Sequence, residues 1–246
     1  MAKSELYKAA GVDIDLATEL LSRAKKDLAS TRRPEMLTPI GGFGGLFSAK
    51  FANYQDPVLV SSIDGVGTKL MIAMMMEKYD TVGIDMIAMV VNDILCVGAE
   101  PIALVDYLAV EEPDPKVAEE IADGLVQGAK ESQIAIIGGE TASLPGIVKD
   151  FDLAGTGIGF VDKDKIITGA DIQEGDILIG LRSSGIHSNG FSLCRKVFDI
   201  DNNNPDLYIP REELGDKTVA EALLVPTRIY VKSILGLLNQ VDVKGI

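Results

Sequence analysis

An aspartate inside an apolar helical pattern is the first sign of chemistry in this sequence. Asn92 and Asp93 follow the apolar run MIAMVV and precede ILCV. A buried carboxylate is costly unless a cation or a metal ion pairs with it. Because helical positions three, four and seven apart share a face, Asp85 lies on the same broad face as this pair. The pattern favours a convergent polar site, although Asp93 could instead cap a neighbouring helix or pair with an arginine.

Two further acidic residues stand beside glycines at the ends of apolar segments. Asp64 ends the strand-like PVLVSSI and precedes Gly65, and Glu140 follows the glycine pair of IIGG. A strand-end aspartate before glycine is also a common turn former. Three carboxylates at the ends of successive elements would suit Mg²⁺, which takes carboxylate and phosphate oxygens and keeps some waters. The sequence therefore predicts a site at which a metal ion offsets the charge of a phosphate ligand.

The single histidine and the two cysteines are weaker signals. His187 lies in SSGIHSNG, among hydroxyls, glycines and Asn189. Imidazole is a good acid or base near neutral pH, but a lone histidine is more often structural or merely exposed. Cys96 and Cys194 are far apart in apolar helical patterns, so we expect reduced, buried thiols rather than a metal cluster.

Composition and charge restrict the classes of partner. The chain of 246 residues has a formal net charge of −14, which opposes nucleic-acid binding through counterion release. It contains no apolar signal-peptide core near the start and no run of about 18 apolar residues. We therefore expect a cytoplasmic protein with neither nucleic acid nor membrane as a partner.

Strand and helix patterns alternate along the chain, which predicts an α/β (α+β-like) fold. Asp114 and Pro115 provide the cap and the first position of one helix. A loop is expected over residues 140–146 and a helical tract around Pro226. The expected strands cover residues 56–64, 102–110, 134–139, 151–162 and 172–181, and the expected helices cover residues 67–80, 81–98, 114–132 and 191–198.

A change in pattern divides the chain into two predicted domains. The apolar periodicity lapses between residues 162 and 170, and a new strand-like segment follows. We expect one domain over residues 1–168 and another over residues 169–246. Within the first, residues 1–50 end in a segment rich in proline and glycine, which predicts a mobile arm.

Several long sequence words resemble one family, aminoimidazole ribonucleotide synthetase, also called phosphoribosylformylglycinamidine cyclo-ligase. They occur in the family's order between residues 7 and 233. The words are YKAAGVDID, TRRPEM, GGFGGLF, DGVGTKL, GIDMIAMVVNDILCVGAEP, DYLA, IIGGETASLPG, SSGIHSNGFSL and VPTRIYVKS.

The resemblance implies a two-domain synthetase fold. The sheet of residues 1–168 would pair across a homodimer into a barrel, with ATP in clefts near the interface, so that this domain binds ATP and mediates dimerisation. Residues 169–246 would form the first part of the second domain. Because the family continues past VDVKGI, we expect that domain to be truncated and incomplete.

The implied activity is the ATP- and Mg²⁺-dependent cyclisation of formylglycinamidine ribonucleotide to aminoimidazole ribonucleotide, with release of ADP and phosphate, in purine biosynthesis. Two alternatives stay open. One is another ATP-dependent synthetase of the same superfamily. The other is a nucleotide-binding and dimerisation module without turnover.

The resemblance also assigns roles to residues. Asp64 and Asp93 look like the magnesium and phosphate ligands, and Lys69 would offset phosphate charge during catalysis. Ser184, His187 and Asn189 are the candidates for substrate recognition, with His187 also a catalytic candidate for proton handling. The implied nucleotide-binding residues are Lys25, Gly42, Phe43, Gly44, Asp64, Gly65, Asp93, Gly138, Gly139, Glu140 and Thr141.

Overall fold

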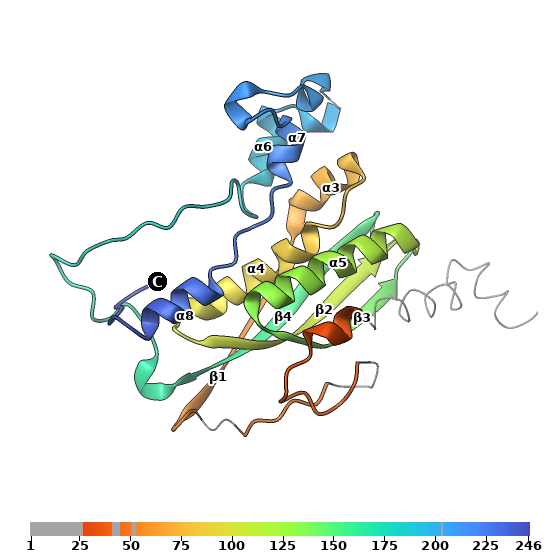
Figure 1. Ribbon diagram of the computed structural model, residues 1–246. Coiled ribbons are helices and arrows are strands. Elements are labelled where there is room, and N and C mark those ends of the chain that lie inside the picture. Colours follow the sequence, from red (N-terminus) through yellow and green to blue (C-terminus); the bar gives the residue numbers. More distant parts are fainter. Residues whose placement is uncertain (1–26, 41–44, 51–52, 203) are drawn as a thin grey trace, which may run out of the picture.

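The computed structural model describes residues 27–40, 45–50, 53–202 and 204–246, in which a twisted four-stranded sheet carries helices on one face (Figure 1). The order across the sheet is β1-β4-β2-β3. The pair β2 and β3 is parallel, and the other neighbouring pairs are antiparallel. The strands are β1 (Pro57–Gly65), β2 (Glu100–Val110), β3 (Ala135–Ser143) and β4 (Phe151–Asp162).

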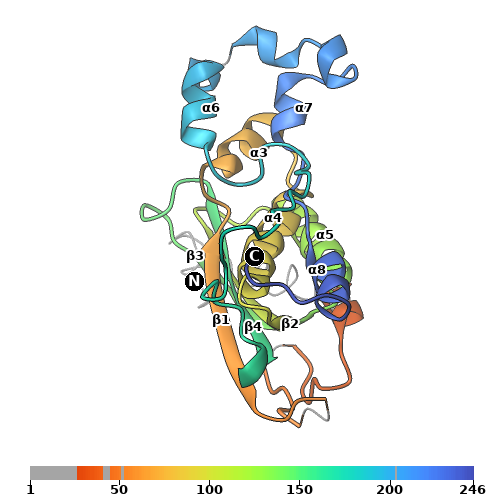
Figure 2. The ribbon, with the colours of Figure 1, turned by 90° about the vertical axis from the view of Figure 1, so that its left-hand side faces the viewer.

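The helices form two groups. One group lies on a single face of the sheet, as the view along the sheet shows (Figure 2): α4 (Val82–Leu95), α5 (Pro115–Ser132) and α8 (Val231–Leu238). The other group lies beyond one end of the sheet: α3 (Leu70–Met76), α6 (Phe191–Val197) and α7 (Val219–Leu223). Short 3₁₀ turns complete the described elements: η1 (Ala29–Thr31), η2 (Gly67–Lys69), η3 (Lys163–Lys165), η4 (Ile200–Asn202), η5 (Pro205–Tyr208) and η6 (Glu212–Leu214).

Helix α5 forms where the sequence predicts it, because both of its ends carry the required residues. The Asp114 side chain accepts hydrogen bonds from the backbone N–H groups of Lys116 and Val117, and Pro115 fills the first turn. At the other end Gln133 adopts a left-handed conformation with φ of 60°. Ile121, Leu125 and Ala129 recur every four residues and are buried, so α5 packs one face on the core and crosses between the parallel strands β2 and β3.

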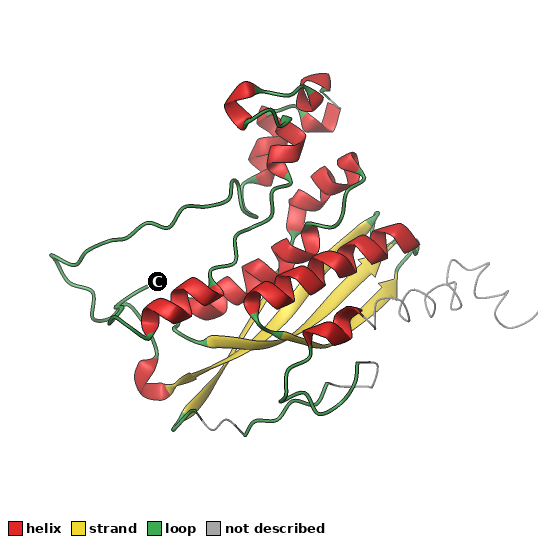
Figure 3. Cartoon of the chain, in the orientation of Figure 1, coloured by secondary structure: helices red, strands yellow, loops and turns green. Residues whose placement is uncertain are grey.

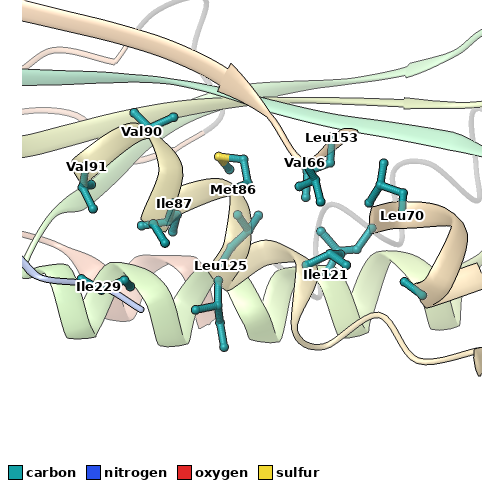
Figure 4. Packing of buried hydrophobic residues seen from close by; sticks show 14 of the residues in the cluster. Val66, Leu70, Met86, Ile87, Val90, Val91, Ile121, Leu125, Leu153 and Ile229 are labelled. Carbon is teal, nitrogen blue, oxygen red and sulfur yellow. The ribbon is translucent and has the colours of Figure 1, made fainter. Parts of the chain in front are cut away.

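Helix α4 packs directly against the backbone of β4, because β4 presents glycines to it. A Cβ atom at Gly155 would overlap the side chain of Met86, and one at Gly157 would overlap Val90. Figure 4 shows Met86 and Val90 pointing from α4 towards the strands. Glycines two residues apart share one face of a strand, and residues four apart share one face of a helix. The glycines of GTGIG therefore leave room on β4 for the side chains of α4, and we call this segment the β4 track.

Two expected elements differ from the structure. Glu140–Ser143, expected in a loop, continue β3, because β2 extends to Val110 and pairs with β3 as far as Ser143. The strand expected over residues 172–181 is irregular chain instead (Figure 3). A strand needs a neighbour for its backbone groups, and no described strand pairs with this segment. Its side chains are therefore exposed, with Ile177 at 87%, Leu178 at 93% and Ile179 at 78%.

The cysteines and Pro226 also differ from what the sequence predicted. Cys96 is exposed rather than buried, since it follows the last turn of α4, where the helix leaves the sheet; Cys194 is half-buried. Pro226 does not lie inside a helix but between α7 and α8. Among the described residues, no helix has both the length and the apolar character needed to cross a membrane.

Residues 29–36, in the described part of the predicted N-terminal arm, lie beside the parallel strands β2 and β3. The Thr31 hydroxyl oxygen accepts a hydrogen bond of 3.2 Å from the Ile136 N–H at the start of β3. Arg33 donates to the carbonyl of Gln133 at 2.9 Å and pairs with Glu35 and Glu100. Residues 29–36 thus pack on the edge where β3 begins.

Candidate active site

The carboxylates of Asp64 and Asp93 lie on the same side of the edge strand β1. Ser62 and Asp64 are two residues apart in the strand, so their side chains share a face. Ser62 donates a hydrogen bond of 3.3 Å from its hydroxyl to Oδ2 of Asp93 on α4. Both aspartates are exposed, and the Asp64 carboxylate accepts a short-range hydrogen bond of 2.8 Å from the backbone N–H of Gly65. A ligand arriving from solvent can therefore reach both carboxylates.

This pair fits magnesium better than a metal that needs a complete protein cage. Among the residues described, no three His, Cys, Asp or Glu side chains are grouped to hold a metal ion. Mg²⁺ commonly takes one or two carboxylates and completes its shell with water and phosphate oxygens. Asp64 and Asp93 are hard oxygen donors open to solvent, and they satisfy that requirement.

A second acidic group lies in the same transverse row of the sheet. Asp64 pairs with Gly155, Gly155 with Asp106, and Asp106 with Gly139. At Gly139 a Cβ atom would overlap Oδ1 of Asp106, so this position requires glycine. Burial raises the pKa of the Asp106 carboxyl to about 6. The glycine expected to approach a ligand thus makes room for a carboxylate of its own protein.

A cavity of about 1040 Å³ opens beside Asp106 and the segment Gly138–Thr141. Its lining is strongly acidic, and among the described residues Lys116 is the one lysine that lines it. A free phosphate would be repelled here, whereas a cation or a metal-bound anion would not. The carboxylates that line it come from Glu77, Asp106, Glu111, Glu112, Asp114, Glu140 and Asp150.

The structure does not bring all three predicted carboxylates together. Gly65, Ala154, Tyr107 and Glu140 form the next row, which places Glu140 on the edge strand opposite β1. Three strand spacings separate the two edges, about 14 Å. Within one chain, Glu140 therefore cannot share a metal ion with Asp64, and the expectation of a three-carboxylate site is wrong.

His187 and Ser184 are held in one loop, and the histidine ring has a defined role within it. Nε2 of His187 accepts a hydrogen bond of 3.1 Å from the backbone N–H of Ser184, and Ser184 donates from its hydroxyl to the carbonyl of Pro226 at 2.7 Å. Burial, and then the nearby charge of Lys69, lower the pKa of His187. Because Nε2 accepts this hydrogen bond, the proton of the neutral imidazole lies on Nδ1. Asn189, the third predicted substrate residue, is exposed in the same loop.

Lys69 points inward, which corrects its expected role as a phosphate counter-charge. Its side chain has no exposed surface, and Nζ donates to Oδ1 of Asp85 at 2.7 Å. It also donates to the carbonyl oxygens of Val225 at 2.7 Å and His187 at 3.2 Å. Burial lowers the Lys69 pKa, while the Asp85 carboxylate opposes that change. The turn of η2 directs this side chain under α4 and away from the surface.

Four of the predicted nucleotide-binding residues belong to segments that the structure does not describe. Lys25, Gly42, Phe43 and Gly44 lie outside the described residues.

Both halves of the chain are similar to known protein families. Residues 50–161 match the family described as AIR synthase related protein, N-terminal domain, and residues 173–246 match its C-terminal domain. A phosphoribosylformylglycinamidine cyclo-ligase of Methanobrevibacter smithii is 57% identical over 98% of this chain and 69% of its own length. The protein of the same name from Carboxydothermus hydrogenoformans is 50% identical over 97% of this chain and 70% of its own length. This chain belongs to the phosphoribosylformylglycinamidine cyclo-ligase family.

A solved structure places this cyclo-ligase family member in a wider fold group. The crystal structure of E. coli HypE, a hydrogenase maturation protein, matches with a TM-score of 0.51 and 17% identity. The match covers 69% of this chain and 49% of HypE. At this identity the similarity concerns the fold alone, which confirms the expected mixed α/β architecture.

Sequence reasoning for this cyclo-ligase family chain did not single out Asp106 or Thr227, and it placed Asp85 on a polar helix face without identifying its partners. Asp85 is fully buried, and its Oδ1 accepts hydrogen bonds of 2.7 Å from both the N–H and the hydroxyl of Thr227. An acid seven residues before Asn92 in an apolar helix was the available signal, because it requires a cationic partner. The sequence indicated that Asp85 and Asn92 share a helix face, but it did not indicate that Lys69 and Thr227 contact Asp85.

Replacing Asp106 with asparagine should stabilise the protein at neutral pH. Its carboxyl has a folded pKa of about 6 against an ordinary value of 3.8, so the folded state retains a proton that the unfolded chain releases. Stability contributed by this group is therefore lost as the pH rises from about 4 to about 6. We expect Asp106→Asn to gain on the order of 1–3 kcal/mol at pH 7 and almost nothing at pH 4.

Thermal unfolding of the parent and the variant at both pH values measures this effect. Asp123→Asn, on the exposed face of α5, is the matched control and should leave both melting temperatures unchanged. An equal shift at pH 4 and pH 7 would contradict the assignment.

Proposed function

We propose that this chain catalyses the ATP- and Mg²⁺-dependent cyclisation of formylglycinamidine ribonucleotide to aminoimidazole ribonucleotide, a step of purine biosynthesis. ADP and phosphate are the other products. The observation that carries the proposal is the exposed carboxylate pair of Asp64 and Asp93, on one side of β1, in a chain of the cyclo-ligase family. Such a pair suits a metal ion that also binds phosphate.

The chemistry activates a poor leaving group. ATP transfers its terminal phosphoryl group to the formyl oxygen, which leaves ADP. The amidine-side nitrogen then attacks the formyl carbon, the carbon–oxygen bond breaks, and phosphate departs. When bound at Asp64 and Asp93, Mg²⁺ would neutralise phosphate charge. The protein contributes mainly by positioning the two substrates.

His187 has a limited role in this scheme. Because Nε2 is engaged by Ser184, the group left for a ligand is the proton on Nδ1. His187 thus donates a hydrogen bond to an acceptor atom of the substrate, and the exposed Asn189 offers both donor and acceptor. The hydroxyl of Ser184 holds the loop through Pro226. We therefore assign this loop to substrate recognition.

Nucleotide contacts are proposed for the other candidates. Gly138, Gly139, Glu140 and Thr141 line the acidic cavity, and Gly65 borders Asp64. Lys25, Gly42, Phe43 and Gly44 keep their predicted nucleotide role, as the family resemblance implies.

The decisive experiment is ADP release by this chain with Mg²⁺-ATP, in the presence and absence of formylglycinamidine ribonucleotide. Substrate-dependent ADP together with the imidazole product supports the proposal. ADP release that ignores the substrate contradicts it.

A second candidate is a nucleotide-binding module without turnover. The observation that favours it is the unpaired segment 172–181, which leaves the second domain without a sheet among the described residues. In this case Mg²⁺-ATP would raise the melting temperature, yet no ADP would form in the same assay.

We further propose a homodimer, formed through the sheet face opposite α4 and α5. Leu59 and Ile63 alternate on that face of β1 with 61% and 73% exposure, and Tyr107 of β2 joins them at 44%. Large apolar side chains exposed together on one sheet face are typical of an interface. The variant Leu59→Lys/Ile63→Lys is expected to sediment as a monomer where the parent sediments as a dimer. Identical sedimentation of the two would contradict this interface.

The proposal also covers the domain division, the cellular compartment and the partners of the chain. We divide the chain into residues 1–168, for ATP binding and dimerisation, and residues 169–246. The gap between the two family matches, residues 162–172, supports this division. The net charge of −14 favours a small-molecule enzyme that does not bind nucleic acid, and we propose the cytoplasm as its location.

A further inference from the structure

A buried polar cluster joins the two halves of the chain, and it gives Lys69 a place different from the phosphate site that the sequence predicted for it. Its members are Lys69, Asp85 and Thr227 with the carbonyl groups of His187 and Val225, and we call it the Lys69 cluster. Lys69 and Asp85 have no exposed side-chain surface. An ammonium group has three hydrogen atoms to donate, and Nζ of Lys69 meets three oxygens at 2.7, 2.7 and 3.2 Å.

The Asp85 carboxylate is used just as fully on one of its oxygens. Oδ1 accepts from Lys69 and twice from Thr227, each at 2.7 Å. Thr227 also shares a hydrogen bond of 2.8 Å with the hydroxyl of Ser188, next to His187. The cluster therefore holds both the 225–227 segment and the 187–188 segment.

A second tie lies two helical turns further along α4. The Asn92 amide donates to the Arg228 carbonyl at 2.9 Å and accepts from the Tyr230 N–H at 3.1 Å. Asp85 and Asn92 are seven residues apart and share a helix face. The same face of α4 thus fixes residues 225–230 at two points.

Because of its position in the chain, Lys69 connects the segment that follows Asp64 to the loop that holds His187. Lys69 is in η2, directly after the turn that begins at Asp64 and Gly65. Its ammonium contacts the backbone of His187 itself, and the ring of Phe191 lies 5.6 Å away. A buried ion pair adds little stability compared with apolar packing of the same volume. Its directed hydrogen bonds do, however, fix which groups lie next to one another.

We propose that Lys69 and Asp85 are positioning residues that fix the His187 loop relative to the Asp64 turn. The proposal rests on the proposed function, in which Asp64 serves the metal-bound phosphates and His187 serves the substrate. The ion pair thereby sets the separation between the two reacting partners without touching either.

The test replaces the ion pair by apolar residues, with Lys69→Met/Asp85→Leu as the variant. Removing both charges leaves no uncompensated buried ion, so the variant should fold. Because His187 is the only histidine, its imidazole nitrogen and Cε1 resonances can be read by NMR without assignment. The parent should show the neutral form protonated on Nδ1.

In the variant we expect mixed tautomers of His187, and a KM for formylglycinamidine ribonucleotide raised at least tenfold. The thermal shift by Mg²⁺-ATP should persist. An unchanged tautomer signature with an unchanged KM would overturn the proposal. If the parent has no turnover, the proposed function fails, while the NMR comparison still decides the positioning role.

Two further variants keep the test sharp. Lys244→Met removes the lysine of an exposed ion pair with Asp176 at 2.6 Å, and it should change neither reading. If the double variant does not fold, Thr227→Val removes the hydroxyl contacts with Asp85 and Ser188 at nearly constant shape. It should shift the His187 tautomer in the same direction, and an unchanged tautomer would again overturn the proposal.

Discussion

Replacing Asp93 with alanine is expected to lower substrate-dependent ADP release by about 10²- to 10³-fold, comparable to the cost of removing one oxyanion-hole donor from an active site. The stability should hardly change. Asp93 is exposed and accepts one hydrogen bond of 3.3 Å, from Ser62, and exposed substitutions typically alter stability by less than about 0.5 kcal/mol. Initial rates of ADP formation and the melting temperature measure the two effects.

A second substitution separates metal binding from a general surface effect. If Asp64 and Asp93 hold the same ion, Asp64→Ala/Asp93→Ala should be no slower than the worse single variant, because residues that act as a unit are not additive. Asp123→Ala, on the exposed face of α5, is the control with full activity. Losses that multiply in the double variant would show that the two carboxylates act separately.

The largest effect on stability is expected for Gly157→Val. The Cβ atom would overlap Cγ1 of Val90 and lie 3.0 Å from Cδ1 of Ile94, both of which are buried side chains of α4. Neither can move away without lifting the helix from the sheet. Overpacking of this kind costs about 3 kcal/mol, which lowers the melting temperature of a chain of this size by roughly 6–12 °C.

The matched control is Gly180→Val, in the irregular segment after β4. A Cβ atom there meets no heavy atom within 4 Å, so the melting temperature should stay within about 1 °C of the parent. Thermal unfolding followed by circular dichroism gives both values. An equal small change at the two glycines would mean that α4 does not rest on the β4 track.

Local rules predicted much of the fold. Asp114 and Pro115 fixed the start of α5, and apolar residues four apart fixed the face it buries. The alternation in FDLAGTGIGFVD marked β4 along its whole length. These features succeed because the cap, the helical period and the strand period depend on residues close together in the sequence.

The failures concern contacts between distant residues. The direction of Lys69 depends on Asp85, Val225 and His187, the last two more than 100 residues away, and the turn motif around Lys69 does not encode them. Glycines beside Glu140 suggested a loop, yet β2 extends far enough to pair with that segment. The positions of Asp64 near a strand end and of Asp93 in a helix, by contrast, were predictable, because each depends on a local sequence pattern.

The unpaired segment Ile177–Leu181 has a practical consequence for anyone handling this protein. Four of its five residues are large, exposed aliphatic side chains, and none of the strands in the described part of the chain pairs with its backbone. Short apolar stretches of this kind act as templates for pairing between molecules. Asp176 and Arg182 flank it as gatekeeper charges, but Asp176 is partly neutralised by Lys244. Solutions of the protein should therefore aggregate as concentration and ionic strength rise, through a segment remote from the proposed dimer face.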